Sequence, residues 1–140
     1  MIIRTFKDED FDSVITLWER CHLNSDEGDL ELDIELKLAH GISLFLVAEA
    51  SGQVVGTLLG GYNGQTGTGS HLAVHPEFRG RGIANALITR LEKKLSAMGC
   101  PKLEFSVSSE NYMLIHMFEN LSYNERNIVV LEKTILHKAE

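Results

Sequence analysis

The stretch "HPEFRGRGIANALITRL", residues 75–91, decides how the rest of the chain is interpreted. Pro76 follows a short apolar run, Gly80 and Gly82 alternate with arginines, and an apolar pattern with helical spacing begins immediately afterwards. The first N–H groups of a helix have no partner within the helix, and they carry the positive end of its dipole. Glycines let such a backbone approach an anion closely. The stretch therefore predicts a strand, a turn and a helix N-terminus that together hold phosphate.

Two other anion-binding motifs do not fit this turn. The GxGxxG spacing of dinucleotide-binding folds would need glycine where Asn85 stands, and the P-loop pattern Gly-x4-Gly-Lys-Ser/Thr is absent. One alternative to a phosphate site is a glycine-rich turn that binds nothing. A nucleotide-binding regulator is another alternative, and it rests on the turn alone.

The composition is typical of a single soluble domain, which we expect to span residues 1–140. The net charge of -7 argues against nucleic acid as a partner. Two isolated cysteines, Cys21 and Cys100, fit a reducing compartment. No apolar run approaches the roughly 20 residues that span a bilayer, and the charged start "MIIRTFKDEDF" is unlike a signal peptide. We therefore expect a cytoplasmic protein without a membrane partner.

Hydrophobic spacing predicts an α/β fold in the order β-α-α-β-β-β-α-β-α-β. The first helix is expected to begin at Asp8, and the last at Asn111. A short second helix is expected to bury Leu32, Leu36 and residues 38–39. The long helix covers 82–98, and residues 63–70 are expected to form a turn. The expected strands are 2–6, 42–50, 54–62, 71–75, 102–108 and 127–136, with an optional short strand near Tyr123. The predicted sheet is mixed and mostly antiparallel, with six to seven strands and helices on both faces.

The segment "LAVHPEFRGRGIANAL" resembles the cofactor-binding motif of the GNAT superfamily of acyl-CoA-dependent N-acetyltransferases. That motif reads Gln/Arg-x-x-Gly-x-Gly/Ala, and Arg79, Gly82 and Ala84 match it. The resemblance extends over most of the chain. The segments most similar to the bacterial YpeA-type acetyltransferases are "ITLWERC", "SLFLVAE", "VVGTLLGGYNG", "RGIANAL" and "RLEKKL".

The resemblance implies that acetyl-CoA is the cosubstrate, and it indicates where each part of the molecule lies. The pantetheine arm would follow a strand that splays from its neighbour, and Asn111 would contact this arm, although Asn111 is equally well explained as a helix N-cap. Residues implied for the arm are Leu72, Ala73 and Val74. Residues implied for the pyrophosphate are Arg79, Gly80, Arg81, Gly82, Ile83 and Ala84.

The resemblance also implies direct attack of a primary amine on the thioester, with the backbone N–H of Val74 as the oxyanion donor. The tyrosine that often protonates the thiolate in this family is replaced by Phe118, whose alternative interpretation is a packed core residue. A family glycine is replaced by Ser122. Tyr112 is the candidate replacement acid.

No general base stands out from the sequence. Relatives often place a glutamate where this chain has Ser106, and Glu104 lies on the same strand face. His71 is a second candidate, because histidine changes charge between pH 5 and 8. Its alternative interpretation is an ordinary polar strand residue. The spacing of His71 and His75 suggests a metal site, but the sequence offers no third ligand, so we expect no metal.

The acceptor side departs from the resemblance. Where YpeA-type relatives carry a segment like Arg-Pro-Trp-Asn-Asp, this chain has "NSDEGDLELDIE". Its first five carboxylates would attract a cationic amine, or would form only a solvated acidic loop; they are Asp26, Glu27, Asp29, Glu31 and Asp33. The sequence predicts an acetyl-CoA-dependent N-acetyltransferase for a small-molecule or protein amine. The alternative is a non-catalytic acyl-CoA-binding or protein-interaction module on the same fold, and a homodimer is left open.

Overall fold

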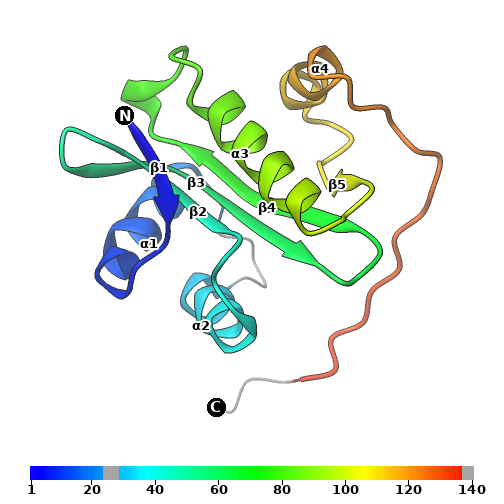
Figure 1. Ribbon diagram of the computed structural model, residues 1–140, viewed down its shortest axis with the longest axis horizontal. Helices are drawn as coiled ribbons and strands as arrows, with labels where there is room; N and C mark the ends of the chain where they lie inside the picture. Colours follow the sequence, from blue (N-terminus) through cyan, green and yellow to red (C-terminus); the bar gives the residue numbers. More distant parts are fainter. Residues whose placement is uncertain (24–28, 137–140) are drawn as a thin grey trace. The chain divides into compact units, whose positions relative to one another are not determined.

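A computed structural model describes residues 1–23 and 29–136 (Figure 1). It divides into two compact units, Met1–Ser106 and Val107–Glu140, which are described separately below. The first unit contains β1 (Ile2–Thr5), α1 (Phe11–Arg20), α2 (Leu30–His40), β2 (Phe45–Ala50), β3 (Gln53–Tyr62), β4 (Gly67–Val74), α3 (Ile83–Ala97) and β5 (Leu103–Phe105). Short 3₁₀ turns precede α1 and α3 at Asp8–Asp10 and Pro76–Phe78. The second unit contains α4 (Tyr112–Asn120).

The five strands form one mixed sheet in the order β1-β2-β3-β4-β5. Neighbouring strands are antiparallel except for β4 and β5, which are parallel because α3 crosses between them. The mixed α/β sheet with helices on both faces is confirmed.

The two faces of the sheet follow from the alternation of side chains along β3. Thr57 accepts a hydrogen bond from Trp18 of α1. On the opposite face, a Cβ at Gly56 would lie 2.9 Å from Ile83 of α3, and one at Gly60 would lie 2.5 Å from Leu91. Glycine at these positions lets α3 pack directly on the strand.

The expected turn at 63–70 is partly wrong, because β4 already begins at Gly67. A Cβ at Gly67 would lie 2.7 Å from Leu95, and a Cβ at Gly69 would lie 2.2 Å from the Phe105 ring. These glycines belong to β4, and their lack of a side chain lets α3 and β5 pack closely against the strand. The glycine-rich composition of the segment therefore does not indicate a turn here.

The expected strand at 127–136 is also wrong: residues 121–136 contain no strand, and none forms near Tyr123. The described sheet therefore has five strands instead of six or seven. Apolar and β-branched residues favour strands only where a neighbouring strand and a packed face are present. Composition alone does not supply either.

Helix α2 buries a different face from the one expected. Leu30 and Ile34 are buried, whereas Leu36 and Leu38 are 47% and 36% exposed. Apolar residues recur at every second position here, so the pattern did not indicate which helical face is buried. Asp29 caps the helix by accepting the Leu32 N–H at 3.1 Å.

Asp10, and not the expected Asp8, anchors the start of α1. Asp10 is buried and accepts the Lys7 N–H at 2.8 Å. Its two oxygens also accept hydrogen bonds from Arg4 at 2.7 and 2.9 Å. The Arg4 guanidinium holds the pKa of the Asp10 carboxyl below its usual range.

We expect Asp10→Asn to lower the free energy of unfolding by about 1–3 kcal/mol at pH 7, because it removes one of the two carboxylates that pair with a partly buried arginine; Glu49 is the other. The folded-state pKa of Asp10 is lowered, so its stabilisation is present above the unfolded-state pKa and is lost as the pH falls through the folded-state value. Urea unfolding at several pH values should show the difference between wild type and variant shrinking below about pH 4. The exposed Asp8→Asn is the control, and a constant difference down to pH 2 would contradict this assignment.

Candidate active site

One edge of β4 is only partly paired. Residues 67–69 lie opposite β5, and no strand among the described residues pairs with the rest of that edge. On the other edge, His75 N–H donates to Val55 O of β3 at 2.8 Å. Backbone groups alternate between edges along an antiparallel strand. The N–H and C=O of Val74 therefore point to the edge that β5 leaves unpaired.

A β-bulge interrupts the same strand. The register of β4 against β3 shifts between Thr57 and Leu59, which gives β4 one extra residue. His71 lies in this bulge with φ of 52°, a left-handed conformation that is uncommon for residues other than glycine. Thr57 Oγ1 donates to the His71 carbonyl at 2.9 Å and accepts from Trp18 Nε1 at 2.7 Å. A buried side-chain pair thus supports the bulge.

The turn that follows β4 has the conformation expected for anion binding. Gly80 and Gly82 have φ of 78° and 79°, which L side chains rarely adopt. A Cβ at either position would meet no atom within 4 Å, so the space in front of the turn is open. The first turn of α3 contains no acidic residue. Glycine backbone, helix N–H groups and open space coincide at this cradle, as they do in anion-binding turns.

Two of the predicted cofactor residues have buried side chains. The side chains of Ala73 and Ile83 are 3% and 4% exposed and pack in the core. Arg79 Nε donates to Val74 O at 3.1 Å, so this arginine ties the turn to the end of β4. The Arg81 guanidinium lies 4.8 Å from the centre of the Phe78 ring. Both arginines therefore also shape the turn.

The end of β4 carries contacts that the sequence did not reveal. Cys21 at the end of α1 donates from Sγ to Val74 O at 3.4 Å. His75 is 9% exposed; its Nδ1 accepts the Glu77 N–H, and its Nε2 lies 3.1 Å from Arg20 Nη1. His75 thus shapes the turn. Among the described residues, no group of three histidine, cysteine, aspartate or glutamate side chains is placed to hold a metal ion.

His71 is the predicted site residue with the most side-chain contacts. Its Nε2 lies 3.0 Å from Asp33 Oδ2 of α2, and its Nδ1 lies 3.0 Å from Ser70 Oγ. The Trp18 ring lies beside the imidazole, with centroids 4.5 Å apart. The structure therefore joins one predicted base to one carboxylate of the acidic segment. Asp26 and Glu27 of that segment lie outside the described residues.

The second unit holds three further predicted residues. Asn111 Oδ1 accepts the Leu114 N–H at 3.2 Å, which confirms its helix-capping role. Tyr112 is 75% exposed in the first turn of α4. Phe118 is 6% exposed, and its ring meets the edge of Tyr123 at 5.3 Å. Phe118 thus has the packed environment of a core residue.

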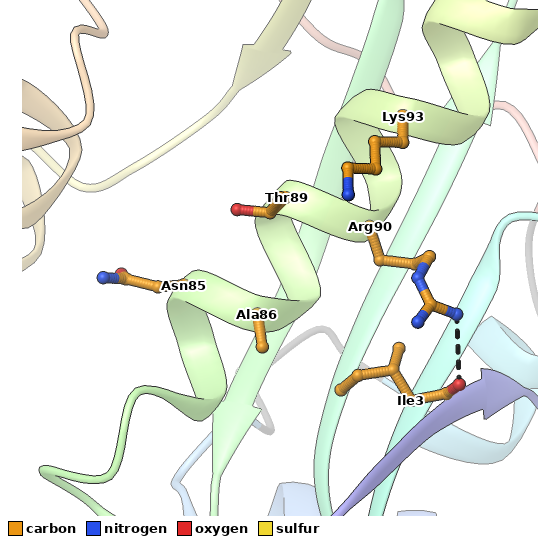
Figure 2. A pocket seen from close by; sticks show the side chains of 6 residues that line it. All are labelled: Ile3, Asn85, Ala86, Thr89, Arg90 and Lys93. Atoms are coloured by element: carbon orange, nitrogen blue, oxygen red, sulfur yellow. Dashed lines mark hydrogen bonds between the residues drawn. The ribbon is translucent and has the colours of Figure 1, made fainter.

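A separate hollow of about 320 Å³ lies along the flank of α3. Figure 2 shows Arg90 reaching across it to donate to Ile3 O, at 3.2 Å, while Asn85, Thr89 and Lys93 line its rim. Ile3 belongs to β1, the strand at the opposite edge of the sheet from the β4 opening. The hollow is therefore distinct from the strand and turn described above. In the part of the chain that is described, no helix is long and apolar enough to cross a bilayer.

Solved structures of similar fold include several acetyltransferases. The ribosomal-protein-S18-alanine N-acetyltransferase of Escherichia coli is 19% identical, with a TM-score of 0.77, and the match covers 90% of this chain and 79% of that one. AAC(6')-Iy in complex with the bisubstrate analogue CoA-S-monomethyl-acetylneamine is 20% identical, with a TM-score of 0.76 and coverage of 96% and 98%. AAC(6')-IG of Acinetobacter haemolyticus, an aminoglycoside 6'-N-acetyltransferase, is 18% identical, with a TM-score of 0.71 and coverage of 96% and 99%.

These likenesses establish the fold, and a sequence match establishes the family. The family model described as "Acetyltransferase (GNAT) family" matches residues 11–123, which include α1, the bulged strand, the glycine turn and α4. The resemblance carried by Arg79, Gly82 and Ala84 is thereby confirmed at the level of the family. The chain belongs to the GNAT acetyltransferase family.

Proposed function

We propose that this protein is an acetyl-CoA-dependent N-acetyltransferase that acts on a primary amine by direct attack. The observation that carries this proposal is the continuity between the unpaired edge of β4, which ends at Val74, and the open glycine cradle at the start of α3. An extended ligand with a pyrophosphate matches this path. The family membership supports acetyl-CoA as that ligand.

The chain's own groups have distinct roles in this proposal. The strand segment of Leu72, Ala73 and Val74 binds the pantetheine arm through the backbone groups that face the unpaired edge, and the N–H groups of residues 79–84 bind the pyrophosphate. Acetyl-CoA, when bound, supplies an activated thioester. The Val74 N–H donates to the developing oxyanion, an interaction whose removal in other enzymes costs about 10²–10³-fold in rate. Holding amine and thioester together contributes through positioning.

The acceptor is proposed to be a cationic primary amine, carried by a small molecule or by a protein. Similar structures carry names that refer to an aminoglycoside and to a ribosomal protein alanine, and both are amine acceptors. Acidic residues at the start of α2 support a cationic partner. The closer relationship to YpeA-type enzymes belongs to this proposal, as do the contact of Asn111 with the arm and the role of Tyr112 as an acid.

The second candidate function is a non-catalytic acyl-CoA-binding module. Phe118 favours it, because this ring is packed within its own unit and has no proton to donate. A missing general acid slows a reaction by about 10²–10⁴-fold without preventing it. A thiolate is also a tolerable leaving group unaided.

A screen for free thiol across amine classes separates the two candidates. The proposal predicts amine-dependent thiol release from acetyl-CoA, strongest for polyamines, amino sugars or peptide N-termini. Acetyl-CoA binding should be measured calorimetrically in the same preparation. Tight binding with no release for any amine would favour the non-catalytic module instead.

We expect Phe118→Tyr to raise kcat by about 10-fold or more, because it restores a hydroxyl that protonates the thiolate in the transition state. The KM for acetyl-CoA should change little, since the hydroxyl acts chiefly in the transition state. Phe11→Tyr on α1 is the matched control. If the chemical step limits the rate and Phe118→Tyr leaves kcat unchanged, the missing-acid interpretation is wrong.

A further inference from the structure

Both ring nitrogens of His71 have a partner. Nε2 lies 3.0 Å from a carboxylate oxygen of Asp33, and a carboxylate only accepts hydrogen bonds. Nε2 must therefore carry the proton of a neutral ring. Nδ1 is then the acceptor, and the Ser70 hydroxyl, 3.0 Å away, donates to it. The contacts fix one tautomer.

This arrangement depends on the bulge in β4. In a regular strand, Ser70 and His71 would point to opposite faces of the sheet. The left-handed conformation of His71, with φ of 52°, brings the two neighbouring side chains together. Such a conformation is strained in a residue other than glycine, and it persists where surrounding contacts enforce it. The Trp18 ring and the Thr57 hydroxyl supply those contacts.

The three side chains differ in exposure. The side chains of His71 and Asp33 are 23% and 36% exposed, whereas Ser70 is an exposed residue. His71 is thus the most buried of the three, and Ser70 is its exposed neighbour. Asp33 lies on α2, in the acidic segment proposed to attract the amine.

We propose that Ser70, His71 and Asp33 form a proton relay that deprotonates the acceptor amine. This inference rests on the proposed function. The ammonium group of the acceptor first loses one proton to water, which leaves a neutral amine with a lone pair. As this nitrogen bonds to the acetyl carbon and the C–S bond breaks, its next proton passes through bridging water to Ser70 Oγ, because Ser70 lies four residues before Val74 on the strand. The Ser70 hydroxyl proton passes at the same time to His71 Nδ1. The imidazolium is stabilised by Asp33 and returns its proton to water, and the thiolate takes a proton from water.

In this relay, Ser70 is the first group to receive the proton and Asp33 is a positioning residue. Asp33→Asn removes the charge that stabilises the imidazolium, and its amide can offer either an oxygen or an N–H to Nε2. The ring is then no longer held in one tautomer, and the Nδ1–H form cannot accept a proton from Ser70. If the contact between His71 and Asp33 were only structural, Asp33→Asn would change the stability of the fold and would have little selective effect on proton transfer. A half-exposed ion pair contributes little to stability.

The first test is spectroscopic and needs no substrate. Nitrogen-15 chemical shifts of His71 should report the Nε2–H tautomer in the wild-type protein and a mixture of the two tautomers in Asp33→Asn. The control variant Glu35→Gln, which removes an exposed carboxylate from the same helix, should leave the tautomer unchanged. An Nδ1–H ring in the wild type would overturn the relay.

The second test is kinetic. His71→Asn, chosen because asparagine tolerates the left-handed conformation, and Asp33→Asn should each lower kcat by about 10²-fold. The KM for acetyl-CoA should stay within about twofold. The double variant should be no slower than either single one, because the residues act as a unit. Ser70→Ala should lower kcat. Ser70→Thr keeps the hydroxyl, so its kcat should stay close to that of the wild type.

The outcomes separate this relay from the proposed function. An active wild-type protein with unchanged kcat in Asp33→Asn, or with additive effects in the double variant, overturns the relay alone. A wild-type protein that transfers no acetyl group to any amine overturns the proposed function, and the relay with it.

Discussion

Gly82→Glu is expected to weaken acetyl-CoA binding by about 10²-fold or more, which corresponds to roughly 3 kcal/mol. The change places a carboxylate at the open N-terminus of α3, where the pyrophosphate is proposed to lie. It adds charge repulsion and fills the space that the ligand needs. Calorimetric titration with acetyl-CoA measures the loss directly.

Backbone strain has to be separated from this effect. Gly82 has φ of 79°, so any side chain there costs about 1–2 kcal/mol of stability. Gly82→Ala carries the same strain without the charge and should bind acetyl-CoA better than Gly82→Glu. Gly52→Glu has a similar φ of 76° in the β2–β3 turn, and should leave binding unchanged. Wild-type affinity in a folded Gly82→Glu protein would refute the cradle.

Trp18→Ala is expected to lower the free energy of unfolding by about 3–5 kcal/mol. Trp18 is 0% exposed, and its ring stacks on Phe45 with centroids 6.1 Å apart. Truncation leaves a cavity between α1 and the sheet, and it also removes the donor to Thr57. Urea unfolding monitored by circular dichroism measures the change.

A conservative series tests which part of Trp18 matters. Trp18→Phe keeps an aromatic ring and loses the N–H, so we expect a cost of about 1–2 kcal/mol. Thr57→Val deletes the same hydrogen bond and also the bond from Thr57 to the His71 carbonyl. Its cost should therefore be smaller in Trp18→Phe than in the wild type, and the cost that remains reports the bond to His71. A loss below about 1 kcal/mol for Trp18→Ala would show that this contact does not hold the bulged strand in place.

Local signals allowed much of the fold to be predicted. The turn before α3 depends on a few neighbouring residues, among them Pro76, Gly80 and Gly82. The same is true of the end of α3, where Gly99 has a positive φ, and of the Asn111 cap. The predictions failed where distant contacts decide the structure. The start of β4 depends on Leu95 and Phe105, and the buried face of α2 depends on which helical side meets the sheet.

In the candidate site, too, local features could be predicted from the sequence and long-range contacts could not. The glycine cradle was visible because its residues are contiguous and have a recognisable spacing. The contacts of His71 were not visible, because Asp33 is 38 residues away and Ser70 meets the ring only through the bulge. The hydrogen bond from Trp18 to Thr57 spans 39 residues in the same way. Hydrophobic periodicity carries no information on such pairs.

The most direct measurement of the central claim is mass spectrometry of protein and amine after incubation with acetyl-CoA. The protein with acetyl-CoA alone should keep its mass, since direct attack forms no acetyl-enzyme. Adding an acceptor amine should yield free thiol and N-acetylated amine in equal amounts. An acetyl group found on a side chain such as Ser70 or Cys21, and then passed to the amine, would contradict direct attack. The absence of acetylated product for every amine class would contradict the transferase assignment itself.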